Sequence, residues 1–165
     1  EAAISHLHAA IHADPENMHA HYALAQIYEV RRDTVAALEV YGQILRFDPR
    51  NVALLNHVGE IHYLVDDVES AAAHFERAKA ILPKNPTTRL WLALLAEQKG
   101  DFKAAAAHVS ESSALTQEAA LNLRLSYYLT QDGRLKEAVG VLERRTNAGR
   151  RTRRYPTSSP WDTTI

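Results

Sequence analysis

A repeat with a period of 34 residues runs along this sequence and limits the folds it can adopt. The tetrapeptide Asp-Pro-x-Asn occupies residues 14–17 and 48–51, and Leu-Pro-x-Asn follows at residues 82–85 with the same spacing. Five alanines share the period, the last of them one residue early: Ala3, Ala37, Ala71, Ala105 and Ala138. Periods of about 20 to 50 residues are typical of chains that stack one supersecondary unit several times. The sequence therefore predicts an array of repeated units instead of a single globular core.

Each unit contains two helical segments separated by a short turn. Leu24, Ala25 and Tyr28 share one face of a helix, because their spacing matches its turn. A second such face begins at Ala37 and ends before Pro49, which cannot continue a helix. Short helices are marginal alone, so the stacking of neighbouring units must stabilise them. The expected helices span residues 2–13, 18–31, 34–47, 52–65, 68–81, 86–99, 102–115, 119–131 and 135–146.

Small residues recur where the two helices of a unit are expected to cross. In the first helices they are Ala25, Gly59, Ala93 and Ser126. The alanines in the second helices keep the same period. Without bulky side chains at the crossing, two helices can approach more closely and bury more area. We therefore expect Gly59 to lie at a close helix crossing.

These positions resemble the tetratricopeptide repeat (TPR), whose signature is W-x2-L-G-x2-Y, then A-x3-F, then P. Residues 52–85 carry Val58-Gly59, Ala71, Phe75 and Pro83 at the matching places. The resemblance extends over residues 1–146, with weaker matches after residue 85. It implies an all-α fold, a right-handed α-solenoid of 34-residue helix-turn-helix repeats with a concave groove.

The resemblance also implies a division of the chain. The units are the second helix of a truncated repeat at 1–17, repeats at 18–51 and 52–85, degenerate repeats at 86–118 and 119–146, and a basic, irregular tail at 147–165. A lone second helix leaves one apolar face without a partner. This favours a sequence cut from a longer chain.

Charge separates the body of the chain from its tail. The net charge is −1 overall, but residues 144–165 contain six arginines and a single acid, Asp162, while residues 1–143 carry a net −6. Three interpretations of the tail remain: it binds nucleic acid or acidic lipid, it folds back on the acidic body, or it is an out-of-frame remnant. The abrupt loss of the repeat favours the remnant, so a nucleic-acid partner is not expected.

The sequence lacks motifs for catalysis or for binding metals and cofactors. There is no cysteine, and no phosphate-binding loop, dinucleotide fingerprint or nucleophile elbow. His8 and His12 are spaced as two metal ligands on one helix, but no third ligand is evident. His57 and His62 are five residues apart and point about 140° away from each other on a helix. We therefore predict a protein that is not an enzyme, with no metal site and no cofactor.

Membrane and targeting signals are also missing. Charged or histidine residues interrupt every apolar stretch before it reaches the about 18 residues that a membrane span needs. No signal peptide is visible, which favours a soluble, cytoplasmic protein. The first residue is not Met, which leaves room for an upstream leader and keeps a periplasmic location as the alternative.

The resemblance implies that the first helices line the groove. In these helices Leu24 and Tyr28 face inward, so the adjacent face is free for a ligand. The side chains expected there are Tyr22, Gln26, Glu29, Asn56, His57, Glu60, Tyr63, Trp91, Leu94, Glu97, Arg124 and Tyr127. Aromatic residues dominate binding hot spots, and the glutamates favour a ligand that carries Lys or Arg beside apolar anchors. The alternative is that some of the aromatic rings only fill space between helices.

These observations predict a scaffold that binds a peptide or a segment of a partner protein in the groove. The alternative is a substrate-recruiting arm of a larger enzyme, of the sulfotransferase or glycosyltransferase type, whose catalytic domain lies outside these residues. The groove lacks the Lys, Asn and Arg set with which related repeats clamp an acidic peptide terminus. The asparagine ladder of sugar-transferase repeats is also absent, since Ala23, His57, Trp91 and Arg124 fill its column.

Overall fold

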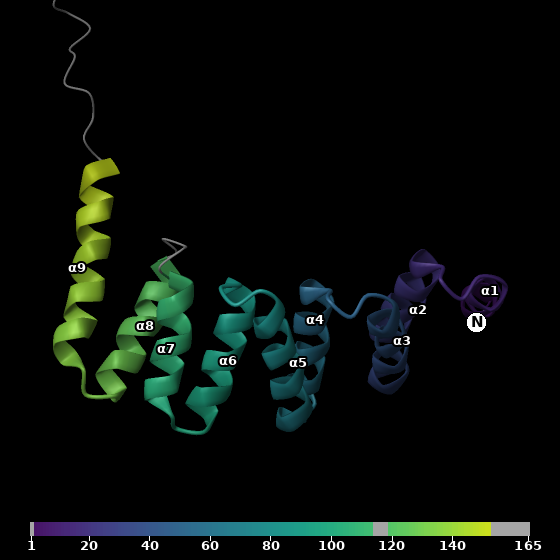
Figure 1. Ribbon diagram of the computed structural model, residues 1–165, viewed down its shortest axis with the longest axis horizontal. Coiled ribbons are helices and arrows are strands. Elements are labelled where there is room, and N and C mark those ends of the chain that lie inside the picture. Colours follow the sequence, from purple (N-terminus) through teal and green to yellow (C-terminus); the bar gives the residue numbers. More distant parts are fainter. Residues whose placement is uncertain (1, 114–118, 153–165) are drawn as a thin grey trace, which may run out of the picture.

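A computed structural model describes residues 2–113 and 119–152 of the chain, and these residues form nine α-helices and no strand. The helices are α1 (Ala2–Ala13), α2 (Met18–Val30), α3 (Thr34–Phe47), α4 (Val52–Leu64), α5 (Val68–Ile81), α6 (Pro86–Gln98), α7 (Phe102–Ser113), α8 (Ala119–Gln131) and α9 (Leu135–Thr152). Each helix packs against the next one along the chain, and the array extends from α1 to α9 (Figure 1). The prediction of an all-α solenoid is confirmed.

The asparagines of the repeated motif begin the first helix of each pair. Asn51 accepts a hydrogen bond at Oδ1 from the amide of Leu54, at 3.0 Å, in the first turn of α4. Asn17 and Asn85 cap α2 and α6 in the same way. Side-chain caps satisfy amides that have no partner within the first turn of a helix. The helix starts are therefore local properties of the sequence.

The second helices begin at a different cap. Asp33, Asp67 and Asp101 accept hydrogen bonds from the amides three residues further on, at the starts of α3, α5 and α7. Arg134 takes this place before α9, and its guanidinium pairs with both carboxylate oxygens of Glu137, at 2.8 and 2.7 Å. The helix α9 thus begins with an ion pair, where α3, α5 and α7 begin with an aspartate cap.

Helix boundaries agree with the predicted ones to within two residues from α1 to α8, but α9 is longer than predicted. It continues to Thr152, six residues beyond the expected end at residue 146. Asn147 and Gly149 are weak helix formers, but arginine favours a helix and no proline interrupts the chain before Pro156. The first residues of the tail that we expected to be irregular are therefore helical, and residues 153–165 lie outside the described residues.

The buried side chains form three apolar clusters in series. The first spans α1 to α5, the second lies between α6 and α9, and a smaller one around Phe75 joins α5 to α6. Ala37, Ala71 and Ala105 are fully buried at the crossings where the repeat places them. Serial clusters are expected of a solenoid, in which each repeat contacts only its neighbours.

Two partly buried histidines lie on second helices, His74 on α5 and His108 on α7. Burial lowers the pKa of each imidazole, and the neighbouring charges of His62 and Arg89 lower the pKa of His74 and His108 respectively. Arg89 Nη1 lies 3.1 Å from Nδ1 of His108, a contact that requires a neutral ring nitrogen as the acceptor. Both rings are therefore held in their neutral form by the fold.

We expect the free energy of unfolding to decrease as the pH falls from about 7 to about 5. Because the folded-state pKa of both rings lies below the unfolded value of about 6.5, the unfolded chain takes up protons first. Replacing His74 and His108 by valine, the residue at the equivalent positions Val40 and Val141, should flatten this dependence. Urea denaturation at several pH values measures it, with His12→Ala on α1 as an exposed control. An unchanged slope in the double variant would contradict the assignment.

Candidate binding surface

The side chains predicted to bind a ligand all lie on α2, α4, α6 and α8, the first helices of the four helix pairs. We call their combined surface the first-helix face. It consists of Tyr22, Gln26 and Glu29 on α2, Asn56, His57, Glu60 and Tyr63 on α4, Trp91, Leu94 and Glu97 on α6, and Arg124 and Tyr127 on α8. The structure divides these residues into those that contact a neighbouring helix and those that do not.

Glu29 and His57 join α2 to α4. His57 Nε2 lies 2.6 Å from Glu29 Oε1, and the imidazole packs edge-on against the ring of Tyr41 on α3, with centroids 5.3 Å apart. Burial raises the pKa of Tyr41 to about 12, and the charge of Glu29 and a hydrogen bond to it act in the same direction. Tyr22 also contributes to this junction, because its hydroxyl accepts a hydrogen bond from Asn51 at 3.2 Å. The polar groups of Glu29, His57 and Tyr22 thus hold neighbouring helix pairs together.

Asn56 lies inside the array and is only 6% exposed. Its Oδ1 accepts a hydrogen bond from the hydroxyl of Thr88 on α6, at 2.9 Å, and its Nδ2 lies 3.5 Å from Oδ1 of Asn85. A side chain with these contacts links α4 to α6 and is not accessible to a ligand. The expectation that Asn56 faces a ligand is therefore corrected.

Trp91 is partly buried and joins three helices. Its ring stacks on Phe75 of α5 with centroids 5.5 Å apart and planes only 5° from parallel. Tyr63 of α4 lies against the same ring at 5.3 Å. Part of the surface of Trp91 therefore fills space between helices, as the alternative interpretation of the aromatic residues expects, and its removal would affect the fold as well as any ligand.

Glu97 also has a contact within the array. Its Oε2 accepts a hydrogen bond from the hydroxyl of Tyr128 at 2.5 Å, which joins α6 to α8. Burial raises the pKa of Tyr128, and the bond to Glu97 raises it further. Glu60 differs, because it makes no hydrogen bond or ion pair with any residue that the structure describes. Of the three glutamates expected to attract a ligand, Glu60 is the one whose charge is uncommitted.

Exposed apolar side chains continue the first-helix face at places that the sequence analysis missed. Val30 and Leu64 are 86% and 72% exposed at the ends of α2 and α4. They lie four residues after Gln26 and Glu60 and so share their faces of the two helices. The 34-residue spacing of Val30 and Leu64 was the available signal, but only the exposure distinguishes them from core residues.

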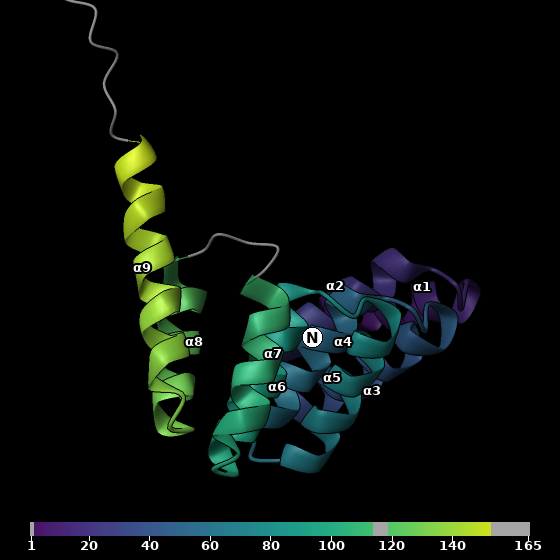
Figure 2. The same cartoon turned by 60° about the vertical axis from the view of Figure 1, so that its left-hand side comes forward.

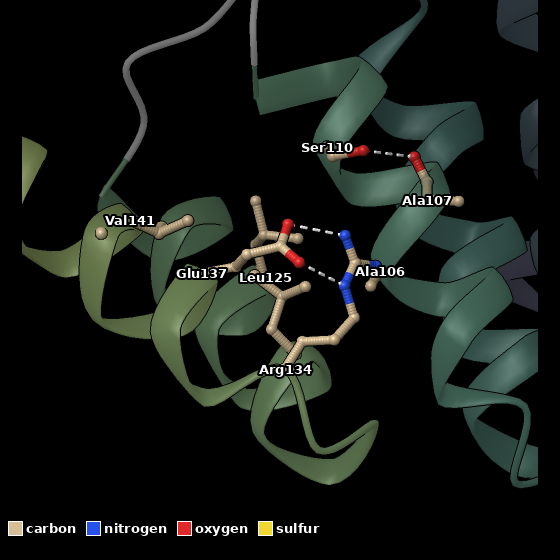
Figure 3. A pocket seen from close by; sticks show the side chains of 9 residues that line it. Ala106, Ala107, Ser110, Leu125, Arg134, Glu137 and Val141 are labelled. Atoms are coloured by element: carbon tan, nitrogen blue, oxygen red, sulfur yellow. Dashed lines mark hydrogen bonds and ion pairs between the residues drawn. The ribbon is translucent and has the colours of Figure 1, made fainter.

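A cavity of about 620 Å³ lies between α7, α8 and α9. Its walls are mainly apolar, with Ala106 on α7, Leu125 on α8 and Val141 on α9, and the Arg134–Glu137 ion pair lies beside it (Figure 3). The size is typical of a ligand site, but the cavity is open, and the guanidinium at its edge is already paired. It offers apolar surface without a free polar group.

Two further properties of the described residues bear on the surface. No group of three or more histidine, aspartate or glutamate side chains within residues 2–113 and 119–152 is arranged to hold a metal ion. None of the helices in this part of the chain combines the length and the apolar character that crossing a bilayer requires.

Comparison with known proteins identifies the family. The family model for the tetratricopeptide repeat matches residues 1–51 and 31–86, which together make up more than half of the chain. The chain belongs to the tetratricopeptide repeat family. Proteins built from this repeat are typically non-catalytic interaction modules. No curated protein sequence matches the chain.

Solved structures of other TPR proteins share the fold. A crystal structure of MamA superposes with a TM-score of 0.73 at 16% identity, covering 92% of this chain and 90% of that one. Pseudomonas aeruginosa PilF gives 0.68 at 23% identity, covering 86% of this chain and 65% of PilF. TTC0263, a thermophilic TPR protein of Thermus thermophilus, gives 0.59 at 19% identity, with 87% and 80% covered. At these identities the likeness concerns the TPR fold alone.

Proposed function

We propose that this TPR chain is a scaffold that binds an extended or helical segment of a protein partner on its first-helix face. The observation that carries the proposal is the exposure of large apolar side chains on three of the first helices. Val30, Leu64 and Tyr127 are exposed on α2, α4 and α8. Single exposed apolar residues are normal, but a series along one face of a solenoid is suited to anchor a bound segment.

The charges on the first-helix face indicate which chemical features its ligand should have. Glu29 and Glu97 are engaged by His57 and Tyr128, which leaves Glu60 as the free carboxylate and Arg124 as the opposing cation. We therefore expect a ligand with two apolar anchors and one basic residue placed to meet Glu60 on α4. A single basic residue opposite Glu60 is a narrower requirement than the general preference for basic ligands that a uniformly acidic groove would have. Electrostatic complementarity of this kind acts mainly on the orientation and the association rate of a ligand.

Selection from a random peptide library tests the proposal. Peptides enriched on the intact protein should share apolar anchors, and Tyr127→Ala should weaken their binding by about 1–3 kcal/mol, mostly through faster dissociation. Tyr127 is 46% exposed and its ring also meets Phe102 of α7, with centroids 6.2 Å apart, so its removal should lower the unfolding midpoint slightly while the protein remains folded. Surface plasmon resonance of the selected peptides measures both rate constants.

The controls separate this face from non-specific apolar binding. Val35→Ala removes an apolar side chain that is 79% exposed on α3, outside the first-helix face, and should have no effect on binding. A library selected on Glu60→Gln should keep the apolar anchors and lose the basic residue. If Tyr127→Ala and Val35→Ala behave alike, the first-helix face is not the binding surface.

A further inference from the structure

Short turns join the two helices of each pair, and they lie along one edge of the array. Both views show the turns from α6 to α7 and from α8 to α9 on the same edge, and the repeat places the two earlier turns there as well (Figures 1 and 2). We call the earlier ones turn 1 (residues 30–34, between α2 and α3) and turn 2 (residues 64–68, between α4 and α5). A neighbouring repeat in a solenoid adds its own turn beside these and does not cover them. Their surface is therefore an edge in an array of any length.

One position in each of the four turns has a left-handed backbone. The φ angle is 59° at Arg32, 63° at Asp66, 73° at Gly100 and 78° at Gly133, and these residues are 34 or 33 positions apart. Glycine adopts a positive φ freely and aspartate is tolerated there, whereas the Cβ atom of a residue such as arginine crowds the backbone. The two later turns use the residue that suits this conformation. Turn 1 and turn 2 keep a charged residue instead.

The side chains of Arg32 and Asp66 have no role in the described fold. Both residues are exposed, and neither side chain forms a hydrogen bond or an ion pair with any residue that the structure describes. Their charges are opposite, although they hold the same position in consecutive repeats. Strained backbone positions that stabilise nothing in their own chain are often found at binding surfaces. The two charges are therefore available for a contact outside the chain.

Exposed apolar side chains accompany the two charges. Val30 and Leu64 lie two residues before the left-handed positions and are again equivalent to each other. Both are largely exposed. The corresponding residues in the later turns, Gln98 and Gln131, are polar. Apolar surface beside a free charge is thus confined to turn 1 and turn 2.

A twofold axis that passes between these two repeats brings complementary groups together. The axis exchanges turn 1 with turn 2, so Arg32 of one copy meets Asp66 of the other, and Val30 meets Leu64. Each contact is formed twice. A twofold interface uses the same patch on both copies, so the patch must be complementary to itself. Opposite charges and shared apolar character at equivalent positions meet this condition, which binding to an unrelated protein would not require.

We infer that the edge formed by turn 1 and turn 2 docks a second copy of this chain, with the two arrays running in opposite directions. Only the turns take part, and contacts below about 1,200 Å² are typically weak and reversible. The dimer covers Val30 and Leu64, which the proposed ligand also uses, whereas Tyr127 on α8 lies outside it. A second copy and a bound segment therefore compete at one end of the first-helix face.

Charge reversal tests the dimer. Sedimentation equilibrium at protein concentrations up to about 1 mM should detect it, and high salt should weaken it. Arg32→Asp makes both turns acidic and Asp66→Arg makes both basic, so each variant alone should dimerise at least about tenfold more weakly. An equimolar mixture of the two variants should form a mixed dimer, because each turn again faces an opposite charge. Lys99→Asp reverses an exposed charge in the turn from α6 to α7 and should leave the dimer unchanged.

A mixed dimer from two monomeric variants cannot result from a change in folding. Each reversal introduces the residue that the other turn has at the same position, so both variants should keep the circular dichroism spectrum of the parent. Arg32→Gly introduces the residue of the later turns, and it should raise the unfolding midpoint while it weakens the dimer.

Three results would overturn the inference. They are a parent protein that stays monomeric at every concentration, single reversals that dimerise like the parent, and a mixture of the two reversals that stays monomeric. Tyr127→Ala should leave the dimer unchanged, so self-association and the proposed ligand binding can fail separately.

Discussion

Replacing Gly59 by leucine should lower the free energy of unfolding by more than about 2 kcal/mol. A Cβ atom at Gly59 would lie 2.6 and 2.8 Å from Cε1 and Cζ of Phe75, closer than packed carbon atoms approach. The ring of Phe75 is fully buried and stacked on Trp91, so it cannot move away without losing that contact. A leucine extends the overlap by three further carbon atoms. Urea denaturation, followed by circular dichroism, measures the loss.

Gly42 on α3 provides the matched control. A Cβ atom there would meet no heavy atom within 4 Å, so Gly42→Ala adds only helix propensity and should stabilise the protein by about 0.5–1 kcal/mol. Replacing the ring of Phe75 by the smaller side chain of leucine should relieve its overlap with a Cβ atom at residue 59. The double variant Gly59→Ala/Phe75→Leu should therefore lose less free energy of unfolding than the sum of the two single changes. A Gly59→Leu protein as stable as the parent would mean that α4 and α5 do not cross at this point.

Tyr128→Ala should be more destabilising, by about 3–5 kcal/mol, because the change empties a large, fully buried site between α8 and its neighbours. Tyr128→Phe keeps the ring and removes only the hydroxyl that donates to Glu97, so about 1 kcal/mol should be lost. Equilibrium unfolding of both variants separates the packing of the ring from its hydrogen bond.

The hydroxyl of Tyr128 also leads us to expect a loss of stability at alkaline pH. Its folded-state pKa is raised, so its contribution is present below the unfolded value of about 10 and disappears above it.

A double-mutant cycle tests the role of Glu97 directly. If Glu97 serves the fold through Tyr128, then Glu97→Gln and Tyr128→Phe should each weaken stability, and the combined loss should be smaller than their sum. If Tyr128→Phe is silent, the bond contributes nothing and Glu97 is free to meet a ligand, as the sequence analysis expected. The parent protein with Glu60→Gln serves as the control, because Glu60 has no partner among the described residues.

The helices could be read from the sequence because their signals are local. Asn51 caps α4 through an amide three residues away, and Asp67 does the same for α5. The end of α9 was the exception. The loss of the repeat pattern at residue 146 suggested a stop, yet backbone helicity depends on the intrinsic preferences of the next few residues and not on whether they match the repeat.

The TPR pattern and the grouping of equivalent side chains on the first helices were likewise determined by the sequence, since a 34-residue period places equivalent positions on equivalent faces. Which side chains on those faces remain free was decided only by the tertiary structure. Glu29 with His57, Asn56 with Thr88, and Glu97 with Tyr128 are contacts between residues 28, 32 and 31 positions apart. Such a contact depends on how neighbouring repeats are rotated against each other and on side-chain rotamers, neither of which the periodic spacing of residues contains.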